Sequence, residues 1–134
     1  CEGLVGSEMC IRDRCNYYGI IGKFIFDMFI YNVTINVEDS IHEKWKKWMI
    51  EIHIPEVLET GCFLESRFSQ VIVKEESGTT YSIQYLYKKK EDFKVYEELY
   101  AEELRNKTED LFGGKYVAFR TTLDIIDIKN KKSL

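Results

Sequence analysis

The residues of this 134-residue chain that are best suited to chemistry are two histidines and, outside the N-terminal segment, one cysteine. If His42 and His53 lie on one helix, they are about 16 Å apart along its axis, because each residue adds about 1.5 Å. At that separation they cannot share a metal ion. No set of Cys, Asp or Glu residues with ligand spacing surrounds either one. We therefore expect no metal site and no cofactor.

His53 is the more interesting histidine, because it lies at the edge of an apolar stripe, just before Pro55. Proline lacks the N–H that an α-helix needs, so we expect the helix to end or bend there. A histidine at a helix C-terminus is favoured in its protonated form and could act as an acid, a base or an anchor for an anion. The alternative is a structural histidine that bonds to the free carbonyl groups of the helix end.

Aromatic side chains supply candidate walls for a pocket around His53. Tyr31, Tyr81 and Tyr85 share one face of the expected sheet if their strands pair in phase, and Trp48 lies on the helix above them. We predict that His53, Trp48, Tyr31 and Tyr85 line a site with apolar walls and a few polar tips. The alternative is an aromatic core without a cavity.

Two other features have simpler interpretations. Cys62 starts a predicted strand and has no patterned partner, so we expect a small buried residue rather than a nucleophile. Gly113-Gly114 follows one predicted helix and precedes no other, which favours a helix cap over a phosphate loop.

Six elements must position these residues, and hydrophobic periodicity predicts each of them. Strands show alternating apolar residues, and helices show apolar residues three and four positions apart. The first helix buries a stripe of Ile41, Trp45, Trp48, Met49 and Ile52 and stops at Gly61. The predicted order is strand, helix, strand, strand, helix, strand, at residues 29–37, 40–60, 62–74, 79–87, 93–111 and 115–127. This order predicts an α+β, ferredoxin-like fold, with a four-stranded antiparallel sheet and both helices on one face.

The second strand is apolar on both faces. Leu64, Phe68 and Ile72 are predicted to point away from the helices, together with Ile30 of the first strand. A sheet with one face in water should alternate more cleanly between apolar and polar residues. We therefore expect a second copy of the chain to cover this face, as a homodimer with these four residues at its interface.

We divide the chain into a leader at 1–27, one domain at 28–128 and a polar tail at 129–134. The leader stretch LVGSEMCIRDR resembles a translated sequencing-adapter scar of metagenomic reading frames, so we interpret 1–27 as an artefact and Met28 as the expected start. A signal peptide is the competing interpretation, although Lys23 interrupts its apolar region and no small-residue cleavage site follows.

Charge and hydropathy exclude two classes of partner. The formal net charge of −4 argues against a nucleic-acid surface, and the third strand lacks the basic-glycine-aromatic signature of RNA-recognition modules. No stretch is long and apolar enough to span a membrane. We expect a cytoplasmic protein that binds neither nucleic acid nor membrane.

Four segments, MFIYNVTINV, HIPEVLETGCF, TTYSIQYLY and FGGKYVAFRTTLDI, resemble the bacterial domain-of-unknown-function family 4286. The resemblance spans residues 28 to about 126 and implies a dimeric α/β barrel, in which two ferredoxin-like sheets pack face to face. It carries over no catalytic residue. The layout is also similar to small antibiotic-biosynthesis monooxygenases, which place a substrate pocket between sheet and helices, but that likeness is one of fold alone.

Two functions remain open. The first is a dimeric barrel that binds a small apolar or aromatic molecule between sheet and helices and acts on it, if at all, without a cofactor. The second is a non-catalytic structural or regulatory dimerisation module. A cavity beside His53 favours the first function, and a filled interior favours the second.

Overall fold

The computed structural model describes residues 27–74 and 77–133 of the chain. The expected leader, apart from Asp27, lies outside these residues. The described chain divides into a larger unit, residues 29–123, and a smaller one made of residues 27–28 and 124–133. In the smaller unit the N–H of Ile125 donates to the carbonyl of Met28 at 3.0 Å, and η3 (Lys131–Ser133) is a 3₁₀ turn within the polar tail.

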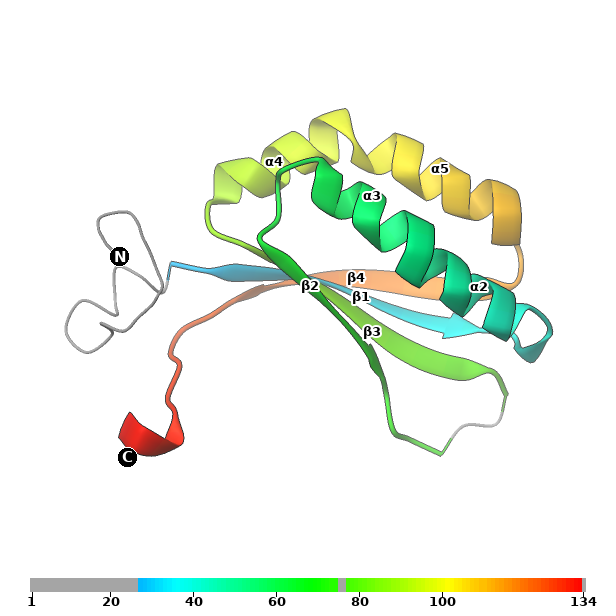
Figure 1. The fold of residues 1–134 in the computed structure, drawn as a ribbon, viewed down its shortest axis with the longest axis horizontal. Helices are drawn as coiled ribbons and strands as arrows, with labels where there is room; N and C mark the ends of the chain where they lie inside the picture. The colour runs from blue at the N-terminus through cyan, green and yellow to red at the C-terminus, as the bar shows by residue number, and fades with distance from the viewer. Residues whose placement is uncertain (1–26, 75–76, 134) are drawn as a thin grey trace. The chain divides into compact units, whose positions relative to one another are not determined.

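The larger unit contains an antiparallel sheet with strand order β2-β3-β1-β4 (Figure 1). Its strands are β1 (Phe29–Val37), β2 (Glu65–Gln70), β3 (Thr79–Tyr87) and β4 (Tyr116–Asp124). β1 and β3 pair along their whole length in the centre, because both alternate β-branched or aromatic residues with polar ones. This order, with a helical segment after the first and third strands, is the ferredoxin-like arrangement, so the predicted fold class is confirmed.

Both helical segments cover the same face of the sheet (Figure 1). The first begins with η1 (Asp39–Ile41) and then runs without a break through α2 (His42–Trp48), η2 (Met49–His53) and α3 (Ile54–Glu59). It stops at Gly61, whose φ of +79° is the left-handed conformation expected there. The second segment, predicted as one helix, is two: α4 (Lys90–Leu99) and α5 (Ala101–Phe112) meet at Tyr100, where the backbone leaves helical geometry. None of the helices in the described ranges is long and apolar enough to cross a membrane.

The helix was expected to end or bend at Pro55, and it does not end there: a π-helical turn leads into α3, in which Pro55 lies in the first turn. The N–H of Ile54 donates to the carbonyl of Met49, five residues back, and the backbone stays helical on both sides. The wider turn accommodates the proline ring, whose missing N–H then breaks no α-helical bond. A π turn contains one residue more than an α turn, which shifts the apolar stripe around the helix. Ile52 is therefore 47% exposed rather than buried.

Aromatic rings dominate the core between sheet and helices. Tyr31 lies at its centre, with ring centroids 5.9 Å from Tyr85, 6.1 Å from Phe63 and 4.9 Å from Phe93. Cys62 is buried at the edge of this core, as expected. The largest fully buried side chains are Trp45, Ile83, Val37 and Val57.

The second strand is shorter than predicted. Phe68 was predicted to point away from the helices, and this prediction is wrong. Phe68 pairs with Ile83 and packs against Trp45 at 5.7 Å and Tyr81 at 5.2 Å, so it lies under the helices. Neighbours across an antiparallel pair share a face, so Ser66 and Phe68 of β2 both belong to the helix-covered face. The buried Phe63 also belongs to the core, so the period-two alternation breaks before β2 starts.

The other two expected interface residues of this region lie outside β2. Leu64 precedes the strand and is exposed, while Ile72 follows it and is 94% exposed. Leu64, Phe68 and Ile72 therefore do not form one apolar row.

The open face is the face of the sheet without helices, and its exposed apolar residues come mainly from β4. Val117 is 73% and Phe119 61% exposed, and Ile30 and Leu86 lie on the same face in the paired central strands. Between them Asn32 donates to Thr121 and accepts from Ser82, a polar network that continues to Thr34.

Candidate functional site

A cavity of about 50 Å³ lies between the sheet and the helices. Tyr31, Tyr85 and His53, three of the four residues predicted to form a pocket, are among its walls. Trp48, the fourth, is not, and Trp45 from one turn earlier takes its place. The remaining walls are Val33, Ile35, Met49, Ile83, Tyr96, Leu104, Arg105, Thr108, Tyr116, Ala118 and Arg120.

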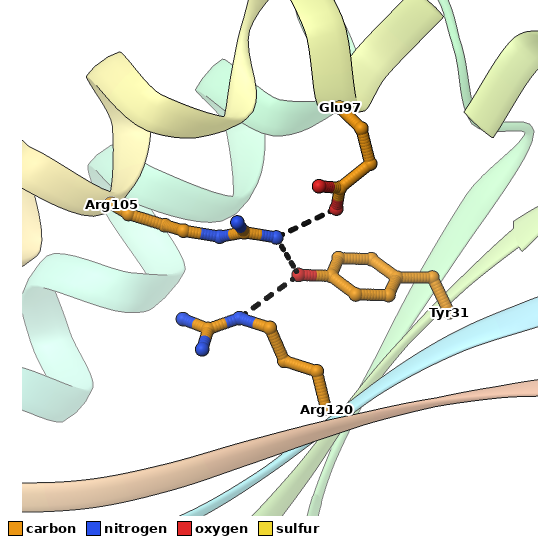
Figure 2. Close-up of polar contacts among 4 residues, drawn as sticks. All are labelled: Tyr31, Glu97, Arg105 and Arg120. Carbon is orange, nitrogen blue, oxygen red and sulfur yellow. Dashed lines mark hydrogen bonds and ion pairs between the residues drawn. The ribbon is translucent and has the colours of Figure 1, made fainter. Parts of the chain in front are cut away.

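The polar end of the cavity is built around the hydroxyl group of Tyr31 (Figure 2). Arg105 Nη2, from α5, and Arg120 Nε, from β4, each donate to this oxygen at 3.1 Å. The same Arg105 nitrogen lies 2.7 Å from a carboxylate oxygen of Glu97 on α4. Three elements thus meet at one phenol oxygen, and α4 joins them through the pair of Glu97 with Arg105. The guanidinium groups are held by charge-assisted hydrogen bonds.

Arg120 marks the place where the cavity meets solvent. It is exposed, whereas the other lining residues are buried or half-buried. Along β4 it lies on the same side as Tyr116 and Ala118, both of which face the helices. Since β4 is an edge strand, Arg120 lies at the edge of the sheet.

Three polar atoms of lining residues are buried without a hydrogen-bond partner in the described part of the chain. They are Trp45 Nε1, His53 Nδ1 and Arg105 Nε. Buried polar atoms in folded proteins almost always have a partner, so such a group calls for a water, an ion or a ligand. Their concentration around one small cavity makes the cavity the strongest candidate site of the described residues.

His53 is neutral at physiological pH, contrary to the expectation of a protonated ring. Its pKa is lowered to about 4, mainly by burial. The negative charge of Glu56 raises the pKa, and the positive charges of Lys107 and Arg120 lower it. His53 does not lie at a helix C-terminus, because the helical run continues past it to Glu59. The ring stacks on Trp48 with centroids 4.8 Å apart.

Three phenol groups of the cavity, those of Tyr85, Tyr96 and Tyr116, keep their protons. Burial raises the pKa of Tyr85 and of Tyr96 well above the ordinary value. Burial, helped by a hydrogen bond to Glu109, raises the pKa of Tyr116 to about 12. These hydroxyl groups therefore remain neutral near pH 7.

The second histidine lies elsewhere. His42 shares a hydrogen bond with the hydroxyl group of Tyr81, and its Nδ1 lies 3.4 Å from a carboxylate oxygen of Glu43. Within residues 27–74 and 77–133, no three His, Cys, Asp or Glu side chains gather where they could hold a metal ion.

The two arginines were missed from the sequence. Arg120 carried a detectable signal, because in the alternating run Tyr116, Ala118, Arg120 a cation takes an inward position in an otherwise apolar row. Arg105 carried none, because α5 has charged residues around most of its surface and its rotation decides which of them points inward.

Comparison with known proteins relates the chain to one family and one fold. The family described as Domain of unknown function (DUF4286) matches residues 28–126. No curated protein matches the sequence.

Solved structures share the architecture at low identity. A dimeric ferredoxin-like protein from an uncultured marine organism is 13% identical, with a TM-score of 0.58 over 77% of this chain and 99% of that one. An EthD-like protein from Ralstonia eutropha is 9% identical, with a TM-score of 0.57 over 78% and 96%. SnoaB, a cofactor-independent oxygenase from Streptomyces nogalater, is 8% identical, with a TM-score of 0.55 over 76% and 96%. At these identities the likeness is one of fold.

Proposed function

This chain belongs to the family described as Domain of unknown function (DUF4286), and we propose that it is a homodimer that binds a small molecule in the cavity beside His53. One observation carries the binding proposal: Trp45 Nε1, His53 Nδ1 and Arg105 Nε are buried without partners, and all three residues line this cavity. Each such atom costs roughly 1–3 kcal/mol. A bound molecule would supply the missing partners.

The size of the cavity limits the size of the group that can bind in it. A cavity that holds benzene is about 150 Å³, and one water needs about 10–15 Å³. The space of about 50 Å³ beside His53 therefore suits a group of a few heavy atoms rather than the aromatic ring expected from the sequence. A larger ligand would place only one end here, with the rest outside the mouth at Arg120.

Binding is better supported than catalysis. A general base works best with a pKa near the operating pH, and burial lowers the pKa of His53 to about 4. At neutral pH the ring can form a hydrogen bond to a bound molecule but is a weak proton acceptor. We therefore assign His53 the role of an anchor.

The homodimer is supported by the open face. Val117 and Phe119 of β4 are largely exposed there, with Ile30 and Leu86 beside them, and an exposed apolar patch of this kind suits a protein partner. The similar marine protein is described as dimeric. Ile30 stays in the proposed interface and Phe119 replaces Phe68, while Leu64 and Ile72 stay candidate contacts at the rim.

A cavity-filling variant tests the binding proposal. We expect part of a panel of molecules of up to about six heavy atoms to shift the indole N–H resonance of Trp45 in a ¹H–¹⁵N spectrum. Ala118→Leu adds apolar volume to the cavity wall and should abolish these shifts. Val117→Leu, one residue away on the open face, should leave them unchanged. The proposal fails if no molecule shifts the resonance, or if Ala118→Leu responds like the wild type.

A second function, a dimerisation module without a ligand, is favoured by the tight aromatic packing away from the cavity. Tyr87 and Phe93 have ring centroids 5.2 Å apart, and Trp48 and Phe112 are 5.4 Å apart. A wild-type protein that is dimeric but shows no shift of the Trp45 resonance with any molecule of the panel would support this function instead.

A further inference from the structure

We propose that the group bound in the cavity is the carboxylate of a small organic acid, held by Arg120, Arg105 and Tyr31. This inference rests on the proposed function, because it names the chemistry of the molecule that the same cavity binds.

The unsatisfied polar groups around the cavity are mainly hydrogen-bond donors. The Tyr31 oxygen accepts from both arginines, so its own O–H proton is left to donate, and no described residue accepts it. Trp45 Nε1 and Arg105 Nε are N–H groups, which donate only. An ionised carboxylate is the matching ligand, because its two oxygens accept hydrogen bonds and donate none.

The charge around the cavity favours an anion. Its walls include two arginines and no Asp or Glu. Arg105 is paired with Glu97, but no carboxylate of a described residue lies within 4.0 Å of Arg120. One positive charge therefore remains uncompensated at the mouth, where it can form a charge-assisted hydrogen bond to an oxyanion.

The apolar walls favour an acid with a short hydrocarbon part over a bare inorganic anion. The walls also include Ile35, Met49 and Ile83. A carboxylate with one or two further carbons matches both the donors and the cavity of about 50 Å³.

The test compares propionate with propionamide, which has nearly the same shape but no charge. Both are titrated into the ¹⁵N-labelled full chain at constant ionic strength, with inorganic phosphate as a third probe. The readout is the indole N–H of Trp45, with Trp48, which does not line the cavity, as an internal reference. We expect saturable shifts with propionate, binding at least about tenfold weaker with propionamide, and no binding of phosphate.

Variants test whether propionate binding depends on Arg120. Arg120→Met keeps the aliphatic stem and should weaken propionate binding about tenfold or more, and Arg120→Lys should recover part of it. Arg67→Met is the matched control, because Arg67 is an exposed arginine of β2 that pairs with Glu65. Amide dispersion in the same spectra shows whether each variant is folded.

The possible outcomes separate the two proposals. Equal binding of propionate and propionamide, or an unchanged affinity in Arg120→Met, would overturn the carboxylate inference and leave small-molecule binding intact. Phosphate binding without propionate binding would also overturn it. If neither propionate nor propionamide shifts Trp45, and the wider panel is silent too, both proposals fall.

Discussion

At the scale of single residues, the hydroxyl group of Tyr31 connects the sheet to the helices. It is the shared acceptor for Arg105 of α5 and Arg120 of β4, and the ring below it is 3% exposed. Hydrogen bonds to charged groups contribute more to stability than neutral ones, at roughly 1.5–3 kcal/mol. Tyr31 therefore acts both as a core residue and as part of the candidate site.

Tyr31→Phe should lower the free energy of unfolding by about 1–3 kcal/mol, because both guanidinium groups lose their acceptor while the ring packing is kept. Chemical denaturation measures this directly. Tyr85→Phe is the matched control. Tyr85 is equally buried and stacks on Tyr31, but its hydroxyl group forms no hydrogen bond to a described residue. Equal losses in the two variants would show that the arginine contacts contribute nothing.

His53 makes stability depend on pH in a predictable direction. Its pKa is about 4 in the folded chain and 6.5 for a free side chain, so between these values the unfolded state binds more protons. Stability should therefore fall as the pH drops from about 6.5 towards 4, by an amount on the order of 3 kcal/mol. Above pH 7 the ring is neutral in both states and contributes no pH dependence.

His53→Phe keeps a ring against Trp48 but cannot take up a proton. As the pH is lowered from 7 to 4, the melting temperature of the wild type should fall relative to that of the variant. Taking the difference between the two proteins removes the pH dependence that they share, so the remainder reports the change at position 53. A difference that stays constant over this range would contradict a lowered pKa.

At the scale of elements, the π turn of η2 sets the position of His53. It carries the helix through Pro55 and leaves His53 in the middle of a continuous helical run. π turns of this kind occur often at functional sites. The expected helix end would have left the ring beside free carbonyl groups instead of inside the core.

Pro55→Ala tests whether the π turn has already relieved the proline. In a regular helix interior a proline costs about 3 kcal/mol, so its replacement should stabilise by a similar amount. Here we expect a change within about 1 kcal/mol of zero, because the wider turn accommodates the ring and alanine adds freedom to the unfolded chain. A gain near 3 kcal/mol in denaturant unfolding would show that the helix is strained at this position.

The sequence predicted the central elements well and the edges poorly, for physical reasons. β1 and β3 alternate regularly, so their bounds were correct. β2 was misread because Phe63 and Leu64 interrupt the alternation before the strand starts, which reverses the facing of Phe68. The break at Tyr100 has no local signal, since neither glycine nor proline lies near it.

The candidate site was predictable only in part. Tyr31 and Tyr85 follow from strand periodicity, and His53 follows from its place beside the apolar stripe. The exchange of Trp48 for Trp45 depends on the rotation of the helix above the sheet, which spacing alone does not determine. The partners of Tyr31 are distant in sequence, and only the packing of four elements brings them together.

At the scale of the whole molecule, the two faces of the sheet differ in character. The helix-covered face holds the aromatic core and the cavity. The open face combines the apolar Val117 and Phe119 with a network of polar side chains around Asn32. In the proposed homodimer, two open faces pack about a two-fold axis and bury these apolar residues.

The most direct test of the proposed homodimer is the mass of the protein in solution, measured by light scattering after size exclusion at tens of micromolar, where a moderate dimer persists. The wild type should have twice the chain mass of 15.9 kDa. Phe119→Asp places a charge in the contact on both sides of the axis and should yield monomers, whereas Phe68→Ala should lower stability and leave the dimer intact. A wild-type mass of one chain at this concentration would contradict the face-to-face dimer.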